Sequence, residues 1–366
     1  MRIGVPREIK IHEYRVGLTP AAVAALTAAG HQVVVEHDAA AAIGFSDADY
    51  RRAGAAVGSA KETFAAELIV KVKEPQLQEC AMLCDGQMLF TYLHLAADRP
   101  QAEALMRSGA TAIAYETVTS PAGGLPLLTP MSEVAGRMSI QVGARALEMA
   151  SGGRGTLLGG AAGVAPGRVT ILGGGVAGTN AATMALGLQA EVTILDRSAQ
   201  RLHWLRRHFN GRARVLMADG NAIGKAVETA DLVVGAVLVP GAAAPRLVTR
   251  EMVEAMANGA AIVDISIDQG GCFETSRPTS HDQPTYVEAG VVHYCVTNMP
   301  GGVARTSTLA LSKVTLPFVM ELASRGWEDA FARDRHFANG LNVHRGSIRH
   351  PEVAKALEHA VPPMAA

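Results

Sequence analysis

The feature that most constrains the fold of this chain is a glycine-rich turn between an apolar strand and a helix. The strand-like run 169–172 leads directly into Gly173-x-Gly175-x-x-Gly178, and an alanine-rich stretch without proline follows. The first glycine of such a pattern permits a tight turn, the second lets backbone N–H groups approach a pyrophosphate, and the third allows close packing of helix on strand. The pyrophosphate would lie at the positive end of the helix. The pattern predicts a dinucleotide-binding unit.

A carboxylate after the next predicted strand supports this interpretation, because a chain with 38 glycines can contain the pattern in a turn that only packs. The strand 191–195 ends at Asp196, about 20 residues after the turn, where the ribose diol of a dinucleotide would lie. The charge of Asp196 would repel a 2′-phosphate, so the sequence favours NAD over NADP. Arg197 and Arg201 follow, and they could hold a phosphate or simply be solvated residues of the predicted helix 199–209.

Composition limits the number of domains and the classes of partner. A chain of 366 residues exceeds the length at which single cores stop growing, so two domains are expected. The 33 basic and 34 acidic residues balance and form no long run, so neither nucleic acid nor a membrane surface is an expected partner. No CxxC pair, signal peptide or membrane span is apparent, which predicts a cytoplasmic protein. No metal is predicted, because no cluster of His, Cys and acids has metal-ligand spacing.

Alternating strands and helices predict two Rossmann-like, doubly wound α/β domains. The strands of the second domain are expected at 169–172, 191–195, 214–217, 232–236, 261–267 and 292–297, and those of the first at 3–5, 31–36, 68–73, 88–93 and 111–114, with a helix at 21–29. Two long helices, 132–149 and 307–323, are expected to join the domains, the second with a kink at Pro317. A further helix, 327–332, belongs to the C-terminal tail. The NAD-binding domain, 131–304, is thus inserted in a substrate domain made of 1–130 and 305–366.

Polar residues that end predicted strands are candidates for the site, because ligands of open parallel sheets bind beyond the carboxyl ends of the strands. Lys73 ends one strand of the first domain, with Lys71 on the same face by two-residue alternation, and Lys73 is preferred because it lies nearer the rim. His94 ends the next strand, and an imidazole can transfer protons near neutral pH. The alternatives are a solvated surface lysine and a structural histidine.

Arg15 lies in the loop after the first strand and could hold a carboxylate with its planar guanidinium group. The alternative is a surface ion pair with Glu8 or Glu13. Asn298 follows the last predicted strand and supplies an amide donor.

The run 262–268 alternates apolar and polar residues, so Asp264, Ser266 and Asp268 are expected on one face of a strand. Asp268 lies farthest toward the carboxyl end, where a carboxylate must be paired or hydrated. The Gln269-Gly-Gly turn that follows would let the backbone approach a ligand closely. Two cations, an imidazole, a carboxylate and an amide at one nicotinamide site together predict an acid substrate that loses a proton.

Several segments resemble the alanine dehydrogenase family, and the resemblance covers nearly the whole chain. They are RIGVPREIK at 2–10, EYRV at 13–16, VKVKEP at 70–75, LHLAA at 93–97, PMSEVAG at 130–136, GAVLVPG at 235–241, DISIDQGG at 264–271 and TNMP at 297–300. The resemblance implies NAD as cofactor and reversible oxidative deamination of L-alanine to pyruvate and ammonia. It also implies a homohexamer. Ala218 departs from the serine that the family often has near the adenosine ribose, which leaves the affinity for NAD open.

The resemblance also implies roles for individual residues. Arg15 and Lys73 would bind the substrate carboxylate, with Asn298 nearby. His94 would be the catalytic acid and base, and Asp268 would be essential beside the nicotinamide. Around NAD the resemblance places, in addition to the three glycines of the turn, Ser132, Val176, Ala177, Asp196, Arg201, Val237, Leu238, Ile265, Ser266, Ile267, Asp268, Arg277, Val296, Thr297, Asn298 and Met299.

Three alternatives to this function stay open. A related dehydrogenase acting on lysine or an opine-like amino acid could use the same two domains. The soluble NAD-binding component of the proton-translocating transhydrogenases passes hydride between cofactors and needs a membrane partner, but it has no use for Lys73, His94 and Asp268 together. A non-catalytic NAD-binding protein would be expected to lack at least one of these charged residues.

Overall fold

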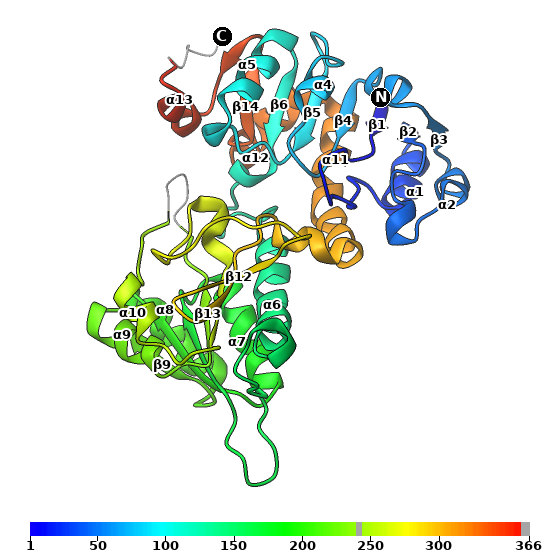
Figure 1. The fold of residues 1–366 in the computed structure, drawn as a ribbon. Coiled ribbons are helices and arrows are strands. Elements are labelled where there is room, and N and C mark those ends of the chain that lie inside the picture. The colour runs from blue at the N-terminus through cyan, green and yellow to red at the C-terminus, as the bar shows by residue number, and fades with distance from the viewer. Residues whose placement is uncertain (239–243, 360–366) are drawn as a thin grey trace. The chain divides into compact units, whose positions relative to one another are not determined.

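A computed structural model describes residues 1–238 and 244–359 of the chain. The chain divides into two compact units, each built on one mainly parallel sheet (Figure 1). Unit 1 comprises Met1–Met131 and Val303–Ala366, and unit 2 comprises Ser132–Gly302. Residues 239–241 of the GAVLVPG segment and 360–366 of the predicted substrate domain lie outside the described residues. The predicted fold class, two Rossmann-like α/β domains, is confirmed.

Unit 1 contains an eight-stranded sheet, in which six parallel strands have the order β3-β2-β1-β4-β5-β6. These strands are β1 (Arg2–Val5), β2 (Gln32–Glu36), β3 (Ala56–Gly58), β4 (Leu68–Val70), β5 (Met88–Thr91) and β6 (Thr111–Ala114). Two antiparallel strands, β14 (Leu341–His344) and β15 (Ser347–Ile348), extend the sheet beyond β6. The C-terminal segment therefore completes the N-terminal sheet.

The helices of unit 1 begin where the sequence supplies a capping side chain. Thr19, Ser46, Ser59 and Asp98 each accept a hydrogen bond from a backbone N–H of the first helical turn. The helices are α1 (Pro20–Ala28), α2 (Asp47–Arg52), α3 (Ala60–Phe64), α4 (Leu77–Cys80), α5 (Arg99–Ser108), α11 (Ala304–Arg333), α12 (Arg335–Ala338) and α13 (Pro351–Leu357).

Unit 2 repeats the same parallel order in a seven-stranded sheet, β12-β13-β11-β10-β7-β8-β9. The parallel strands are β7 (Arg168–Leu172), β8 (Glu191–Asp196), β9 (Arg214–Met217), β10 (Leu232–Gly235), β11 (Ala261–Asp264) and β13 (Val291–Tyr294), and β12 (Thr285–Glu288) is antiparallel. The helices are α6 (Thr129–Ala146), α7 (Val176–Gly187), α8 (Ala199–Phe209), α9 (Gly220–Glu228) and α10 (Arg250–Glu254). The order of the strands reverses between β7 and β10, the position at which such sheets bind ligands.

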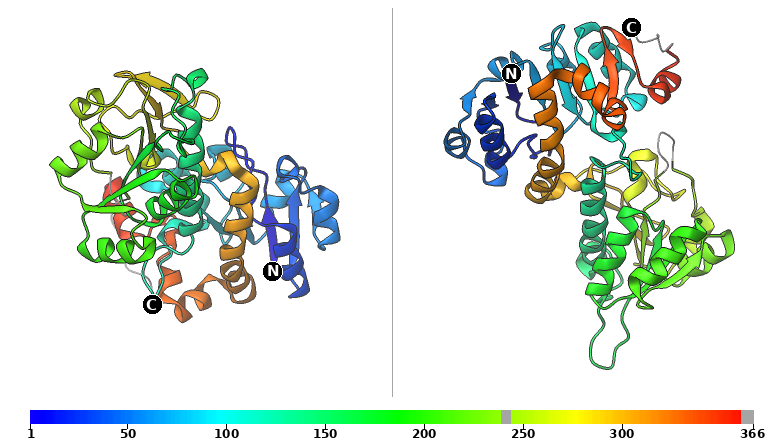
Figure 2. Two further views of the ribbon diagram at one scale, coloured as in Figure 1. Left: turned by 90° about the horizontal axis from the view of Figure 1, so that it is seen from below. Right: turned by 180° about the vertical axis from the view of Figure 1, so that it is seen from behind.

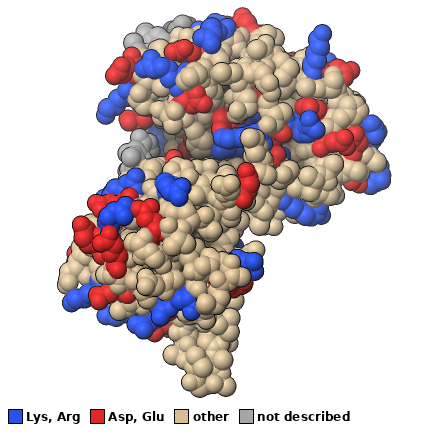
Figure 3. All heavy atoms as spheres, in the orientation of Figure 1, with Lys and Arg blue, Asp and Glu red and all other residues tan. Residues whose placement is uncertain are grey.

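An uncharged extension projects from unit 2 between the 3-10 helix η4 (Met149–Ser151) and β7 (Figures 1 and 2). Its two sides meet at an isolated bridge between Ala161 and Val164. Residues 155–167 contain no charged side chain, and Figure 3 shows the extension without blue or red atoms. Leu157 and Val164 in it are 71% and 63% exposed.

Three predicted strands end three residues too late, and all three errors concern candidate site residues. The strand expected at 68–73 ends at Val70, the strand expected at 261–267 ends at Asp264, and the strand expected at 292–297 ends at Tyr294. After Asp264 the chain forms the 3-10 helix η5 (Ile265–Gln269), because the Asp264 carboxylate accepts the N–H of Ser266 at 3.0 Å. The alternation that predicted a shared face for Asp264, Ser266 and Asp268, and for the two lysines, was therefore wrong.

The predicted helices exist. Helix α11 covers both predicted segments, 307–323 and 327–332, and its non-helical dihedral angles occur between them, at Gly326 (φ 76°, ψ 167°), because glycine adopts a positive φ without steric cost. The dihedral angles at Pro317, where a further kink was predicted, remain helical. Among the described residues, no helix is both long and apolar enough to span a membrane.

Candidate functional site

The surroundings of the three glycines in the turn of unit 2 differ. A Cβ on Gly173, whose φ is 98°, would lie 2.6 Å from the carbonyl oxygen of Ala236, and one on Gly178 would lie 1.8 Å from that of Gly173. A Cβ on Gly175, at the start of α7, would meet nothing within 4 Å. The first and third glycines thus serve the packing of the protein itself. The second faces open space, so a pyrophosphate could approach the backbone there.

Asp196 and Arg201 are both bound to this turn. The Asp196 carboxylate accepts the N–H of Gly174 at 2.8 Å through Oδ2 and that of Ser198 at 2.8 Å through Oδ1. Arg201 donates from Nε to the Gly174 carbonyl oxygen and from Nη2 to Thr179 Oγ1 at 2.9 Å. Burial lowers the pKa of Arg201, and the charge of Asp196 opposes that shift. Arg201 is therefore not a freely solvated arginine, because two of its three guanidinium nitrogens already donate to the turn and to α7.

Asp264 is a buried carboxylate that holds the segment after β11. It accepts hydrogen bonds from the N–H groups of Ser266 and Cys272, both at 3.0 Å, and from Ser276 Oγ at 2.6 Å. Burial raises the pKa of Asp264 above its ordinary value, although these hydrogen bonds oppose the shift. Gly271 passes so close that a Cβ would lie 2.6 Å from Asp264 Oδ2. Asp264 thus fixes the turn that carries Asp268 and does not itself face solvent.

The ends of β10, β11 and β13 bring several predicted cofactor residues together. Ser266 Oγ donates a hydrogen bond to the carbonyl oxygen of Val237 at 2.7 Å. The same Oγ accepts a hydrogen bond from the Val237 N–H at 3.0 Å. Asp268 is exposed, and its Oδ1 accepts the N–H of Asn298 at 3.2 Å. Asn298 adopts a left-handed conformation with a φ of 59°, which is well tolerated by asparagine. The exposed Asp268 and the partly buried Asn298 are therefore joined by one hydrogen bond at this end of the sheet.

The remaining predicted cofactor residues differ in their exposure. Ile267, Val296 and Met299 are buried, whereas Ser132, Ala177, Val237 and Ile265 are partly buried and Val176, Leu238 and Thr297 are exposed. Arg277 lies over the ring of Tyr286, with 3.9 Å between its Cζ and the ring centroid. The buried members can contribute to a cofactor site by packing behind it.

In unit 1, Arg15 forms a buried ion pair. Its side chain is 2% exposed, and Nη2 and Nε contact the two carboxylate oxygens of Glu13 at 2.5 and 2.7 Å. Burial lowers the pKa of Arg15, but the hydrogen bonds and charge of Glu13 raise it by more. The pairing with Glu13 that was one alternative is present, but it is not a surface pair. Because both donors of the guanidinium edge are held, the orientation of Arg15 is fixed.

Lys73 is held by the carboxylate next to it in the chain. Its Nζ lies 3.3 Å from Glu74 Oε2, and Lys10 binds the other oxygen of Glu74. Burial raises the pKa of Glu74, but Lys73 and Lys10 lower it more, to about 2. Glu74 therefore stays ionised and holds the Lys73 ammonium in a site that leaves 12% of the side chain exposed.

Lys71 has a different environment from Lys73. Its side chain is completely buried, and its ammonium contacts Glu79 Oε1 at 2.7 Å and Glu8 Oε2 at 3.0 Å. Burial lowers the pKa of Lys71, but the two carboxylates raise it by more. The sequence-based preference for Lys73 agrees with this exposure, whereas the expectation that both lysines share one face does not.

His94 lies three residues after the end of β5, directly before the 3-10 helix Leu95–Ala97, in a left-handed conformation with a φ of 49°. Its backbone N–H donates to Glu116 Oε1 at 2.6 Å, and its Nδ1 lies 3.9 Å from the same oxygen. The imidazole stacks on the ring of Tyr92, with 5.8 Å between centroids and an interplanar angle of 8°. The ring remains 49% exposed, so it is held in orientation while it stays accessible to a substrate. A left-handed non-glycine residue is commonly found at functional sites.

Sequence reasoning named Glu13 only as a possible surface partner of Arg15, and it missed Glu74 and Glu116, which hold Lys73 and His94. Glu116 follows β6, so the rule that selects polar residues after strands would have found it. Glu13 and Glu74 lie beside their partners in the chain but carry no distinguishing pattern. The role of Glu8 could not be predicted, because its partner Lys71 is 63 residues away.

Two family models match consecutive parts of the chain. The alanine dehydrogenase/PNT N-terminal domain matches residues 4–135, and the alanine dehydrogenase/PNT C-terminal domain matches residues 139–351. The chain belongs to the alanine dehydrogenase/PNT family. Membership of this family implies a nicotinamide cofactor, and the glycine turn with Asp196 fits one. The predicted resemblance is therefore confirmed.

Relatives within the alanine dehydrogenase/PNT family match nearly the full length of the chain. An alanine dehydrogenase of Halomonas elongata is 59% identical over 97% of this chain and 96% of its own. One of Mycolicibacterium smegmatis is 51% identical over 98% and 97% of the two chains. A solved structure of an L-alanine dehydrogenase is 54% identical and superimposes with a TM-score of 0.95 over 98% and 99%. A transhydrogenase from Sinorhizobium meliloti is 25% identical, with a TM-score of 0.81 over 96% and 99%.

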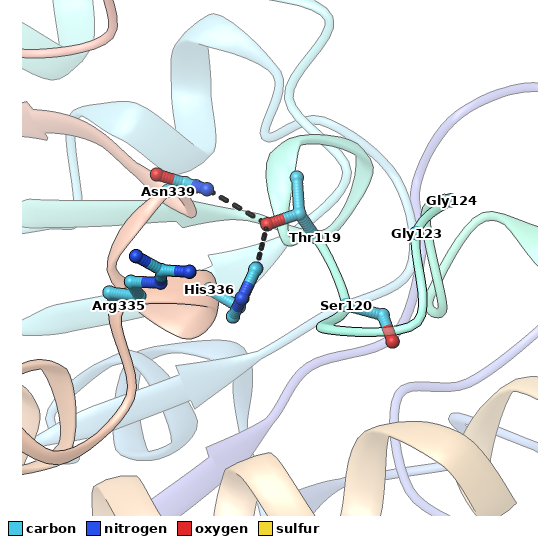
Figure 4. A pocket seen from close by; sticks show the side chains of 7 residues that line it. All are labelled: Thr119, Ser120, Gly123, Gly124, Arg335, His336 and Asn339. Carbon is cyan, nitrogen blue, oxygen red and sulfur yellow. Dashed lines mark hydrogen bonds between the residues drawn. The ribbon is translucent and has the colours of Figure 1, made fainter.

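This member of the alanine dehydrogenase/PNT family also has a cavity of about 460 Å³ in unit 1 that contains no predicted site residue. Thr119 Oγ1 accepts a hydrogen bond from Asn339 Nδ2 at 2.8 Å and lies 2.8 Å from His336 Nδ1 (Figure 4). The residues that line it are Thr119, Ser120, Gly123, Gly124, Arg335, His336 and Asn339. None of the predicted substrate residues lines this cavity.

Proposed function

We propose that the protein is an NAD-dependent L-alanine dehydrogenase, which catalyses the reversible oxidative deamination of L-alanine to pyruvate and ammonia. The identity of 59% to an alanine dehydrogenase, over 97% of this chain, is the observation that carries the proposal. Arg15, Lys73, His94 and Asp268, the residues that this chemistry needs, are all present. In this proposal unit 1 supplies the groups for the amino acid, and unit 2 those for the cofactor.

The contacts around Asp196 support NAD as the cofactor, which accepts hydride when bound. The Asp196 carboxylate lies beside the glycine turn and retains acceptor capacity for a ribose diol after its two backbone contacts. A 2′-phosphate would be repelled there. Arg201 is already occupied by the turn, so it offers such a phosphate little compensation.

Arg15 and Lys73 are proposed to bind the substrate carboxylate. A hydrogen bond to a charged group contributes about 1.5–3 kcal/mol, so two such contacts can both bind and orient a small acid. Glu13 forms an ion pair with Arg15, and Glu74 forms one with Lys73. The substrate then meets cations whose positions are already restricted, which lowers the entropic cost of binding.

His94 is proposed to be the acid and base of the reaction. When hydride leaves the α-carbon, the amine becomes an imine, and His94 deprotonates the water that adds to it. The exposed imidazole, held by Tyr92 stacking and by Glu116, supports this role. Asp268 is proposed to lie beside the nicotinamide, with its carboxylate anchored by the N–H of Asn298.

The direct test of this function measures NADH absorbance after mixing the protein with NAD and, separately, L-alanine, L-lysine or L-serine at mildly alkaline pH. Reduction of NAD with L-alanine alone, reversed by pyruvate and ammonia, is the expected result. Reduction with L-lysine instead would favour a related amino-acid dehydrogenase. NAD binding without any turnover would favour a non-catalytic protein or, given the transhydrogenase likeness, a hydride-transfer component.

We also propose that the enzyme is a cytoplasmic homohexamer. Its four cysteines are all free thiols, as expected in a reducing compartment. Light scattering coupled to size-exclusion chromatography measures the mass of the assembly, and a monomer or dimer would contradict the hexamer.

A further inference from the structure

Two carboxylates share the buried ammonium of Lys71, but only one of the two contacts the backbone of Lys73. Glu8 and Glu79 have side chains that are 2% and 3% exposed, and they lie 3.0 and 2.7 Å from Lys71 Nζ. Glu8 Oε1 also accepts the N–H groups of Val72 at 2.7 Å and of Lys73 at 3.3 Å. The second oxygen of Glu79 instead accepts the N–H of Gln76 at 2.8 Å, at the start of α4.

The backbone of residues 71–73 depends on such contacts because β4 ends at Val70. Beyond that residue the N–H groups of Val72 and Lys73 need partners from elsewhere, and Glu8 provides them. The carbonyl oxygen of Lys71 accepts from Tyr115 Oη at 2.9 Å, and that of Lys73 from Thr91 Oγ1 at 2.9 Å. The position of Lys73 is thus set from two sides, by the ends of β5 and β6 and by Glu8.

Glu8 belongs to the segment that carries Arg15. Residues 6–19 join β1 to α1, and they contain both side chains. Glu8 is therefore a direct link between the segment of one substrate cation and the backbone of the other. Burial raises the pKa of Glu8 above its ordinary value, although the charge of Lys71 and the hydrogen bond from the Val72 N–H oppose the shift.

We propose that Glu8 is a positioning residue for the amino-acid substrate, which sets the spacing between Arg15 and Lys73 while Lys71 balances its charge. The inference rests on the proposed function, because it assumes that the two cations bind one carboxylate. Two cations bind a carboxylate together only if their spacing fits it. A changed spacing would therefore weaken substrate binding, because one carboxylate could no longer reach both cations at hydrogen-bond distance.

The test replaces Glu8 by glutamine. In Glu8→Gln the amide keeps one acceptor oxygen but turns an NH₂ group either toward the Lys71 ammonium or toward the backbone donors, so one set of contacts is lost. We expect KM for L-alanine and for pyruvate to rise about tenfold, with kcat changed by less than about threefold. KM for NAD should stay within about twofold of the wild type, because the glycine turn and Asp196 are unchanged.

Glu79→Gln is the matched control. It removes the same charge from the same ammonium at equal burial, but it leaves the contacts of Glu8 with Val72 and Lys73 intact. We expect both variants to lower the urea midpoint of unfolding by similar amounts, while Glu79→Gln leaves KM for L-alanine within about twofold of the wild type. Equal increases in KM for both variants would mean that the ion cluster is only structural, and an unchanged KM in Glu8→Gln would overturn the proposal.

A second pair of variants applies if Glu8→Gln does not fold. Glu8→Asp keeps the charge toward Lys71 but is one methylene shorter, so it cannot keep all three contacts, and Glu79→Asp is its control. Wild-type turnover is measured first, because its absence with L-alanine contradicts the proposed function and not this inference. If another amino acid is turned over, its KM replaces that of L-alanine. If none is, the dissociation constant of L-alanine measured by calorimetry replaces KM, with the same comparison between variants.

Discussion

The two units have the same parallel strand order, but the connection that follows the first strand differs in its side chains. In unit 2 the first strand, β7, is followed by a connection of glycines, 173–175, and α7 begins at once. In unit 1 the first strand, β1, is followed by the longer connection 6–19, which carries Glu8, Glu13 and Arg15. The comparison teaches that topology decides where a ligand can bind, whereas the first connection decides what binds. A turn without side chains offers backbone N–H groups to phosphate, and a charged connection offers cations to a carboxylate.

The largest expected effect comes from adding a side chain to one closely packed glycine in each unit, Gly178 at the start of α7 and Gly17 in the connection 6–19. Gly178→Val places carbon atoms against the carbonyl oxygen of Gly173, where even a Cβ would be 1.8 Å away, so NAD binding should be lost. Gly17→Val, where a Cβ would lie 2.4 Å from the carbonyl oxygen of Val70, should raise KM for L-alanine and leave NAD binding intact. Calorimetric titration with NAD measures the difference.

Gly187→Ala in the same helix as Gly178 is the control, because a Cβ there meets nothing within 4 Å. It should bind NAD like the wild type. NAD binding that survives Gly178→Val would break the comparison, since the close packing of turn and helix would then be dispensable.

Removal of the imidazole should have the next largest effect. His94→Ala should lower kcat by about 10² to 10⁴, the contribution of general acid–base catalysis, while the dissociation constant of NAD stays unchanged. Steady-state kinetics and NAD titration measure the two quantities. His203→Ala, which removes an exposed imidazole from α8, should change neither. Equal losses of turnover and NAD affinity in His94→Ala would identify a structural histidine.

Glu74 tests whether the charges of unit 1 also stabilise its fold. Because its pKa is lowered from 4.5 to about 2, the ionised carboxylate stabilises the fold above pH 4.5, and this is lost as the pH falls toward 2. The shift corresponds to a contribution of about 3 kcal/mol. Urea unfolding should show the wild type more stable than Glu74→Gln at pH 7, with the difference shrinking at pH 3. Glu352→Gln, at an exposed site, should show no such change, and a constant difference for Glu74→Gln would contradict the assigned ion pairs.

Arg15→Lys sharpens the comparison by keeping the charge but removing the planar group. Lysine cannot contact both oxygens of Glu13 and a substrate carboxylate in fixed geometry. We expect substrate binding to weaken by about 2 kcal/mol, so that KM for L-alanine rises about 30-fold while KM for NAD stays unchanged. A wild-type KM would mean that Arg15 serves only its buried pair with Glu13.

The smallest effect concerns the choice of cofactor in unit 2. Asp196→Asn removes the charge that repels a 2′-phosphate, so the preference for NAD over NADP, measured as the ratio of kcat/KM values, should fall about tenfold. Glu191→Gln, at the other end of β8, is the control and should keep the preference. An unchanged preference in Asp196→Asn would place the discrimination elsewhere.

Features that depend on neighbouring residues could be predicted well. The glycine turn follows from the residues at three positions, and helix α8 has the predicted bounds because Ser198 caps its start and Asn210 ends it in a left-handed conformation. Arg15, Lys73 and His94 were found because each follows a strand. The segment after Asp264 was predicted wrongly, since one side-chain hydrogen bond outweighed a clear alternating pattern.

The sequence by itself determined the class of fold, the dinucleotide turn and the inventory of chemical groups, because local sterics and spacing suffice for these. The tertiary structure alone decided which groups are held and by what. It joined β14 to β6, paired Glu8 with Lys71 across 63 residues, and buried Lys71 while it left Lys73 partly exposed. The physical reason is that the energy of a charge depends on its burial and its partner, and both arise only when distant segments of the chain meet.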